Sequence, residues 1–333
     1  MTRSQWLDST SPKTKSTLQP SRGVVPERSR KRLGLALKIA FSLAGLIFLA
    51  ITFHRTWDRS RQHVLPSAWA LGSAWVFAMV SLSLLAKSWV SLLAGHAPRP
   101  AVASGFYTAQ LGKYLPGGVW QAVGQIGLAK RAGVTTPIAV TAFPVHAIVQ
   151  ATAGGTVGTA LAVIGWGIPL PVRLASLAGV LLLPLLRRPW MLRVMSLLAR
   201  LLRRSWPETL VPSQGRILRS YAYGLAAVGS SGAGFMLLAS SLRAGVSMPA
   251  LVPVFALAWT AGFLALPFPS GIGVREAVLI VVVGTAAAAP LIGASIAHRL
   301  MTMAAEVVMI GLAAVRERWT PDRDARAMRS EPS

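Results

Sequence analysis

The chain has 333 residues, of which 53% are hydrophobic and only 13% are charged. Soluble proteins carry about 25% charged residues, so this chain cannot cover a water-facing surface of its size. Several apolar runs exceed the roughly 18 residues that a membrane-spanning helix requires. The composition therefore excludes an ordinary soluble domain and predicts an all-α, polytopic membrane protein.

The charges are strongly unbalanced, with 34 Lys and Arg against 10 Asp and Glu and a net charge of +24. In a soluble domain this excess would indicate a nucleic-acid partner. Here the basic residues lie mainly in the polar segments between apolar runs, which is how the positive-inside rule encodes topology. We therefore expect no nucleic-acid binding.

The side chains that most enzymes use are scarce. No Asp or Glu lies between Asp58 and Glu208, and only Glu276 and Glu306 fall inside apolar segments. A two-carboxylate hydrolase or a carboxylate-rich cation site therefore lacks its ligands. There is no Cys, the five histidines are scattered, and no Walker A, G-x-S-x-G or H-E-x-x-H motif occurs. We expect no metal, no cofactor and no enzymatic activity.

The chain begins with a polar tail. Residues 1–32 are rich in Ser, Thr, Pro and basic side chains, which predicts a disordered cytoplasmic tail before a transmembrane domain over 33–316. The first apolar run, 33–53, is long enough to span about 30 Å. A second span is predicted from about Pro66 to Leu93 and returns to the cytoplasm.

The next segment, 101–130, has a different pattern. Two short apolar stretches, each too short to span, flank a Pro-Gly-Gly sequence that breaks a helix. Arg99 precedes the segment and Lys130 and Arg131 end it, so both ends should be cytoplasmic. The pattern predicts a re-entrant helical hairpin.

The middle of the chain is predicted to cross the membrane twice and then enter a basic loop. Spans are expected over 137–166 and 170–186. Residues 187–219 carry eight Arg and one Glu, which makes them the clearest cytoplasmic loop. Within that loop, 190–204 has the pattern of a basic amphipathic helix, which should lie at the inner-leaflet surface beside anionic lipid.

The C-terminal part has a similar organisation. A span is expected over 217–242, and the apolar segment 249–289 is broken near Pro269 by a Gly-rich sequence. The last span, 291–315, is followed by a cytoplasmic tail over 317–333. With that tail inside, the broken segment must enter and leave from the outside.

The predicted architecture is thus six full spans and two re-entrant hairpins, or about eight helices by hydropathy alone. Both termini are expected on the cytoplasmic side of the cell membrane. The hairpins occupy corresponding positions in the two halves and open to opposite sides, which is typical of transporters built as an inverted repeat. The predicted helix breaks are Pro116, Gly117, Gly118, Pro269, Gly271 and Gly273.

Charged side chains at membrane depth cost about 2.5–3.5 kcal/mol each, so they are candidates for function. The candidates are Lys87, Lys113, Arg275, Glu276, Arg299 and Glu306. Four of these side chains are cationic and two are anionic, which suits an anionic ligand.

Several candidates also have a structural interpretation. Lys87 is close enough to a span end to snorkel to the surface. Arg275 and Glu276 adjoin the second break, where they could contact a ligand or brace the broken backbone. Arg299 and Glu306, two turns apart on one helix face, are predicted to form an ion pair.

Three further residues also have both a functional and a structural interpretation. Trp120 and Gln121 could line a ligand path, although a Trp beside a membrane break is as often an interfacial anchor. His146 is predicted to be a packed core residue rather than a proton carrier.

The two break regions resemble a known family. Gln110 to Gln121, followed by a Lys-Arg-Ala-Gly-Val sequence at 130–134, resembles the first signature of the lysylphosphatidylglycerol synthase transmembrane-region family of flippase-like proteins. Pro269 to Glu276 is similar to the second signature, with Ser270 in place of the commoner Gly. The resemblance covers roughly residues 33–316.

This resemblance implies an integral membrane domain that handles lipids, with the soluble synthase domain of the larger members expected to be absent. Taken with the charges, it predicts translocation of an anionic phospholipid or a polyprenyl-phosphate-linked glycolipid. The residues expected at the lipid head group are Lys113, Trp120, Gln121, Arg275 and Glu276.

Two other classes of function stay open. One is a non-transporting scaffold that holds an envelope glycosyltransferase or another envelope-biosynthesis enzyme at the membrane. The other is a membrane-embedded lipid transferase, for which Glu276 or Glu306 would have to serve as general base. A homodimer also stays open, because homo-oligomers are common among proteins, but no residue in the sequence argues for one.

Overall fold

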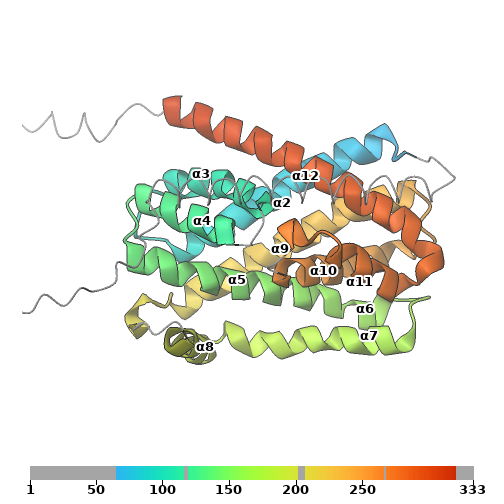
Figure 1. The fold of residues 1–333 in the computed structure, drawn as a ribbon, viewed down its shortest axis with the longest axis horizontal. Helices are drawn as coiled ribbons and strands as arrows, with labels where there is room; N and C mark the ends of the chain where they lie inside the picture. Colours follow the sequence, from blue (N-terminus) through green and yellow to red (C-terminus); the bar gives the residue numbers. More distant parts are fainter. Residues whose placement is uncertain (1–64, 116–118, 202–206, 266–267, 320–333) are drawn as a thin grey trace, which may run out of the picture. The chain divides into compact units, whose positions relative to one another are not determined.

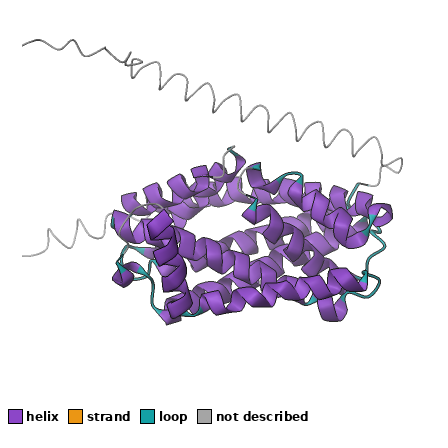
Figure 2. Ribbon diagram, turned by 60° about the horizontal axis from the view of Figure 1, so that its bottom comes forward, coloured by secondary structure: helices purple, strands orange, loops and turns teal. Residues whose placement is uncertain are grey.

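The computed structural model describes residues 65–115, 119–201, 207–265 and 268–319 (Figure 1). Within these ranges the chain forms helices joined by turns and contains no strand (Figure 2). The predicted span 33–53, the predicted N-terminal tail and the break residues Pro116, Gly117 and Gly118 lie outside the described residues. Of the predicted C-terminal tail, residues 317–319 are helical and 320–333 lie outside the described residues.

Four of the described helices are long and apolar enough to cross a membrane. They are α2 (Ala68–Leu92), α5 (Thr136–Thr159), α9 (Gln214–Ser241) and α12 (Thr285–Trp319). These four overlap the spans predicted over 66–93, 137–166, 217–242 and 291–315, so the all-α prediction is confirmed for this part of the chain. Helix α12 begins at Thr285, within the segment 249–289 that was predicted as the second hairpin. Such a set of helices fits a helical membrane protein.

The segment predicted as a span over 170–186 is less regular. It begins as α7 (Leu170–Ser176) and continues as a 3₁₀ helix, η2 (Leu177–Leu186), which contains Pro184. Proline has no N–H to donate and disfavours a regular α-helix. After η2 the chain turns by 91° into α8 (Arg188–Leu201).

Helix α8 covers most of the segment predicted to be amphipathic. It buries Met191, Met195 and Ala199, which recur every four residues on one face, and it exposes Arg193 and Arg200. In Figure 1 it is seen end-on, whereas α5 and α7 run lengthwise. The 3₁₀ turn η3 (Glu208–Leu210) then leads to α9, and the short α6 (Leu161–Ile164) connects α5 to α7.

Two pairs of short helices pack against the long ones. The first pair is α3 (Arg99–Ala109), extended by the 3₁₀ turn η1 (Gln110–Tyr114), and α4 (Val119–Arg131). The second pair is α10 (Met248–Leu264) and α11 (Val274–Val283), joined through the turn η4 (Pro269–Gly271). Within each pair the two helices contact each other, so each broken segment folds back on itself.

The contacts of the first pair have counterparts in the second. Helix α4 packs on α5 as α11 packs on α12, and α3 packs on α2 as α10 packs on α9. Helix α5 contacts α9 as α12 contacts α2, while α2 and α9 contact each other extensively. Exchanging α2–α5 with α9–α12 therefore leaves this contact pattern unchanged.

A buried histidine packs among aromatic rings in each half. The His146 ring of α5 lies 5.4 Å from Trp89 and 5.9 Å from Phe106, centroid to centroid. The His298 ring of α12 lies 4.9 Å from Phe255. The prediction that His146 is a core residue is confirmed, since it is 6% exposed and also contacts Gln150.

Candidate functional site

The two helix breaks meet in space. Turn η1 contacts turn η4, although the two lie in different halves of the sequence. Five charged residues gather around this contact: Lys113, Arg275, Glu276, Arg299 and Glu306. We refer to these five residues as the break cluster. Sequence reasoning named all five residues, and the structure brings them together.

The second break is formed by left-handed backbone. Ser270, Gly271 and Gly273 have positive φ angles of 52°, 68° and 83°, a backbone region that residues other than glycine rarely adopt. A Cβ atom at Gly271 would also lie 2.5 Å from the backbone of Gly262, so η4 approaches α10 too closely for any side chain there. Helix α10 therefore ends before this point, and α11 starts anew after it.

The first hairpin is closed by a close approach and an amide pair. A Cβ atom at Gly112 would lie 2.7 Å from the backbone nitrogen of Gln121, so η1 packs directly on the start of α4. The Gln121 side-chain amide donates to Oε1 of the buried Gln110 at 3.3 Å. The structure thus places Gln121 within the hairpin, while Trp120 lies partly buried beside it in the first turn of α4.

Lys113 forms an ion pair with Glu306. The Glu306 side chain is 1% exposed, and its Oε1 accepts a hydrogen bond from the Lys113 ammonium, which links η1 to α12. The Lys113 ammonium also lies 5.2 Å from the centre of the Tyr114 ring. This pair therefore fixes the first break to the middle of α12.

Glu276 braces the second break. Its Oε2 accepts the Gly273 backbone N–H at 2.8 Å, which satisfies a donor that the interrupted helix leaves open. Its Oε1 accepts from Ser295 Oγ and from Arg299 Nη2, each at 3.1 Å. Of the two interpretations given above, the contacts of Glu276 match the bracing of broken backbone.

The predicted ion pair between Arg299 and Glu306 is wrong, because the structure gives each a different partner. Arg299 pairs with Glu276 of α11, whereas Glu306 pairs with Lys113 of η1. Seven residues of α-helix separate the two side chains by about 10 Å along the axis. They share a face of α12, but each meets a different hairpin.

Arg275 is the remaining cation of the cluster. Its side chain packs over Gly262, where a Cβ atom would lie 2.6 Å from Arg275 Cγ. Its Nε is buried and has no hydrogen-bond partner among the described residues. Since each carboxylate of the cluster already pairs with another cation, Arg275 supplies one positive charge in excess.

The arrangement is suited to binding an anion. Helix α4 begins just after the first break, so its N-terminal end adds partial positive charge to that of Arg275, whereas the N-terminal end of α11 is already capped by Glu276. Within the described ranges, no group of three or more His, Cys, Asp or Glu side chains could hold a metal ion.

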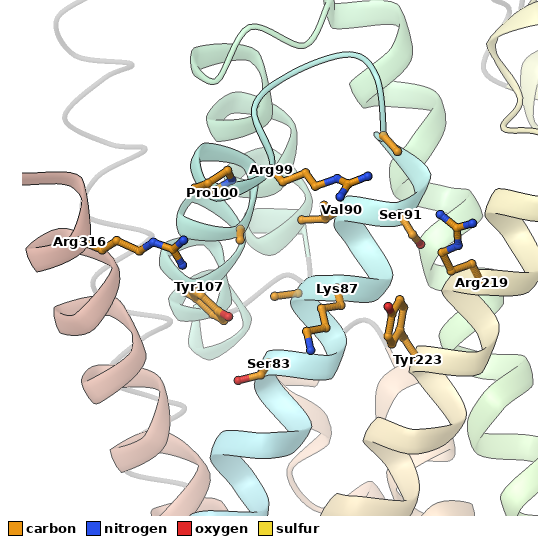
Figure 3. Close-up of a pocket in the computed structure, with 13 residues that line it drawn as sticks. Ser83, Lys87, Val90, Ser91, Arg99, Pro100, Tyr107, Arg219, Tyr223 and Arg316 are labelled. Atoms are coloured by element: carbon orange, nitrogen blue, oxygen red, sulfur yellow. The ribbon is translucent and has the colours of Figure 1, made fainter. Parts of the chain in front are cut away.

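The sequence interpretation missed a second feature. A cavity of about 600 Å³ lies between α2, α3, α9 and the end of α12 (Figure 3). Its lining includes the cationic side chains of Lys87, Arg99, Arg219 and Arg316. The sequence alone accounts for each of these residues by its position near a helix end or in a basic loop, and no signal in the sequence indicates that they face one cavity.

The comparisons with known proteins leave the family open. No protein-family model matches the chain, and no curated protein matches it either. The resemblance of the two break regions to the flippase-like family therefore stays a prediction.

Proposed function

We propose that this protein translocates the phosphate-bearing head group of an anionic lipid across the cell membrane. The observation that carries the proposal is the meeting of two helix breaks at a buried cluster with one cation in excess. Transporters commonly place their substrate sites where broken helices of two repeats meet, with half-helix N-termini directed at anionic groups. The cargo proposed is an anionic phospholipid or a polyprenyl-phosphate-linked glycolipid.

The proposed topology has six spans and two re-entrant hairpins related as an inverted repeat. The exchangeable contact pattern of α2–α5 and α9–α12 supports this arrangement. Helices α3, α4 and α11 have 11, 13 and 10 residues, or about 15–20 Å, which is shorter than the hydrocarbon core of about 30 Å.

The distribution of basic residues supports the proposed orientation. One end of the long helices carries Arg99, Lys130, Arg131, Arg187, Arg188, Arg193, Arg200, Arg216, Arg219 and Arg316. The opposite helix ends carry Arg173 and Arg243. By the positive-inside rule the first end is cytoplasmic, which includes the end of α12.

In this proposal Arg275 interacts with the lipid phosphate while it passes the breaks. The other four residues of the break cluster hold the two hairpins on α12. This division of roles also disfavours a lipid transferase, because Glu276 and Glu306 are both engaged by cations and a general base must be available to accept a proton.

The experiment is a translocation assay in liposomes that contain fluorescent phosphatidylglycerol, with an external quencher reporting transfer between leaflets. We expect Arg275→Gln to reduce the rate by about tenfold or more, since a charge-assisted contact to phosphate is lost. Its matched control is Arg131→Gln, which changes an exposed arginine at the end of α4 and should leave the rate unchanged.

The outcome also separates translocation from the scaffold alternative. Arg275→Gln leaves both ion pairs of the cluster intact, so the variant should fold and a loss of rate would reflect the lost cation. Wild-type rates for both variants would overturn the proposal. A scaffold would then be tested by deleting charge from α8 and measuring recruitment of an envelope glycosyltransferase.

A further inference from the structure

The cavity between α2, α3, α9 and α12 has the features of a second binding site. We call it the basic cleft and define it by Lys87, Tyr107, Arg99, Arg219, Tyr223 and Arg316. Figure 3 shows these side chains converging from four helices, with Lys87 of α2 beside Tyr223 of α9 and Arg316 of α12 directed toward Tyr107 of α3.

All the charged side chains that line the basic cleft are positive. They are four cations, and the lining contains no carboxylate. Lys87, Arg99 and Arg219 are exposed, and their side chains form no hydrogen bond or ion pair with any residue that the structure describes. Like charges that share a concave surface repel each other and concentrate an anion between them. A phosphate group would neutralise them and accept their hydrogen bonds.

An apolar groove continues from the basic cleft. A second cavity of about 180 Å³ lies between α3 and α12 and shares Tyr107 and Arg316 with the first. Its remaining lining is largely apolar and includes Met309, Leu312 and Ala313. Leu312 is 54% exposed, so the described chain leaves this wall uncovered.

A charged cleft beside an apolar groove matches an amphiphile better than a soluble anion. A free phosphate would use the cations but would leave the groove exposed. A lipid phosphate would fill the cleft with its head group and the groove with part of a hydrocarbon chain, whose burial is favoured by the hydrophobic effect.

We infer that the basic cleft binds the phosphate head group of an anionic membrane lipid, with an acyl chain in the groove between α3 and α12. This site is separate from the break cluster, and its occupancy does not require that any lipid cross the bilayer. It would hold a lipid at the end of the bundle that carries most of the basic residues.

The test uses the absence of native cysteine. A single thiol is introduced by Ala103→Cys, because Ala103 lines both cavities. The full chain is placed in nanodiscs of phosphatidylcholine, alone or mixed with phosphatidylglycerol, and the rate of maleimide labelling is measured. We expect phosphatidylglycerol to slow labelling about tenfold by occupying the cleft. Thr135→Cys in the exposed turn between α4 and α5, outside both cavities, is the control and should be unaffected.

The charge dependence decides between binding and mere exclusion of the reagent. Adding Arg99→Gln and Arg219→Gln should abolish the protection, whereas adding Arg131→Gln and Arg187→Gln, exposed arginines outside the cleft, should preserve it. Protection that survives loss of Arg99 and Arg219, or equal labelling in both kinds of nanodisc, would overturn the inference.

Two further arms identify the source of the phosphate and separate this site from translocation. Glycerol phosphate added to phosphatidylcholine nanodiscs should not protect the thiol. Protection equal to that of phosphatidylglycerol would show that the basic cleft binds a soluble phosphate and does not require a lipid. Adding Arg275→Gln should leave the protection intact, because that residue lies outside the cleft lining. Translocation can therefore fail while lipid binding at the cleft persists, and the reverse result is equally visible.

Discussion

The break cluster and the basic cleft use charge in opposite ways. In the break cluster, cations and carboxylates from three elements pair with each other, and Glu306 is 1% exposed. In the basic cleft the cations line an open cavity, and three of them have no partner among the described residues. Pairing of charges indicates a role in holding the fold, whereas cations without partners indicate a role toward a ligand. Arg275 is the member of the break cluster that resembles the cleft.

This comparison has a direct energetic meaning. Removing one member of a buried ion pair leaves the other charge unpaired at low dielectric, which costs about 3–5 kcal/mol. Removing an exposed cation costs little stability, because water already solvates it. Stability and ligand binding should therefore respond to different residues.

The largest effect is expected for Glu276→Gln. This substitution leaves Arg299 beside Arg275 without a carboxylate, and it weakens the acceptor of the Gly273 N–H. We expect a loss of about 3 kcal/mol in the free energy of unfolding, measured as a fall in the unfolding temperature in detergent. Glu208→Gln, an exposed glutamate in η3, is the matched control and should have no effect. If both variants unfold like the wild type, Glu276 does not brace the break.

The second effect concerns the ion pair between Lys113 and Glu306. Lys113→Met should destabilise the protein by about 3 kcal/mol, because it leaves the buried Glu306 carboxylate unpaired. Adding Glu306→Gln should restore part of this loss, since a neutral amide is easier to bury than a lone carboxylate. A double-mutant cycle should give a coupling of about 1–3 kcal/mol.

Additive effects in that cycle would contradict the pairing of Lys113 with Glu306.

The comparison is sharpened by Arg99→Gln combined with Arg219→Gln in the basic cleft. That variant should unfold within about 0.5 kcal/mol of the wild type while it loses protection by lipid. A cleft variant as unstable as Lys113→Met would erase the distinction between the two regions.

The sequence predicted the helices well because their signal is local. Apolar runs of sufficient length located α2, α5, α9 and α12, and Gly and Pro located the second break. The sequence could not assign the partners of Arg299 and Glu306. Helical periodicity places both on one face of α12, but the hairpin that reaches each one is decided by tertiary packing.

The basic cleft shows a different limit of sequence reasoning. Lys87, Arg99, Arg219 and Arg316 come from four separate helices, and each has a sufficient explanation in snorkelling or in the positive-inside rule. Only the packing of α2 against α3, α9 and α12 brings them around one cavity. Gly112 and Gly262 were missed for the same reason, since a close backbone approach has no signature in a single sequence.

The smallest effect isolates the backbone of the break from its charges. Ser270 has a left-handed φ of 52°, which costs a residue with a Cβ atom about 1 kcal/mol. Ser270→Gly removes this strain but makes the unfolded chain more flexible, so we expect a net stabilisation of about 0.5 kcal/mol. Ser196→Gly within α8 is the contrasting control and should destabilise by about 0.5–1 kcal/mol, because glycine weakens a helix. If both substitutions lower the unfolding temperature equally, the left-handed turn at Ser270 contributes no strain, and the ion pairs alone account for the energetics of the second break.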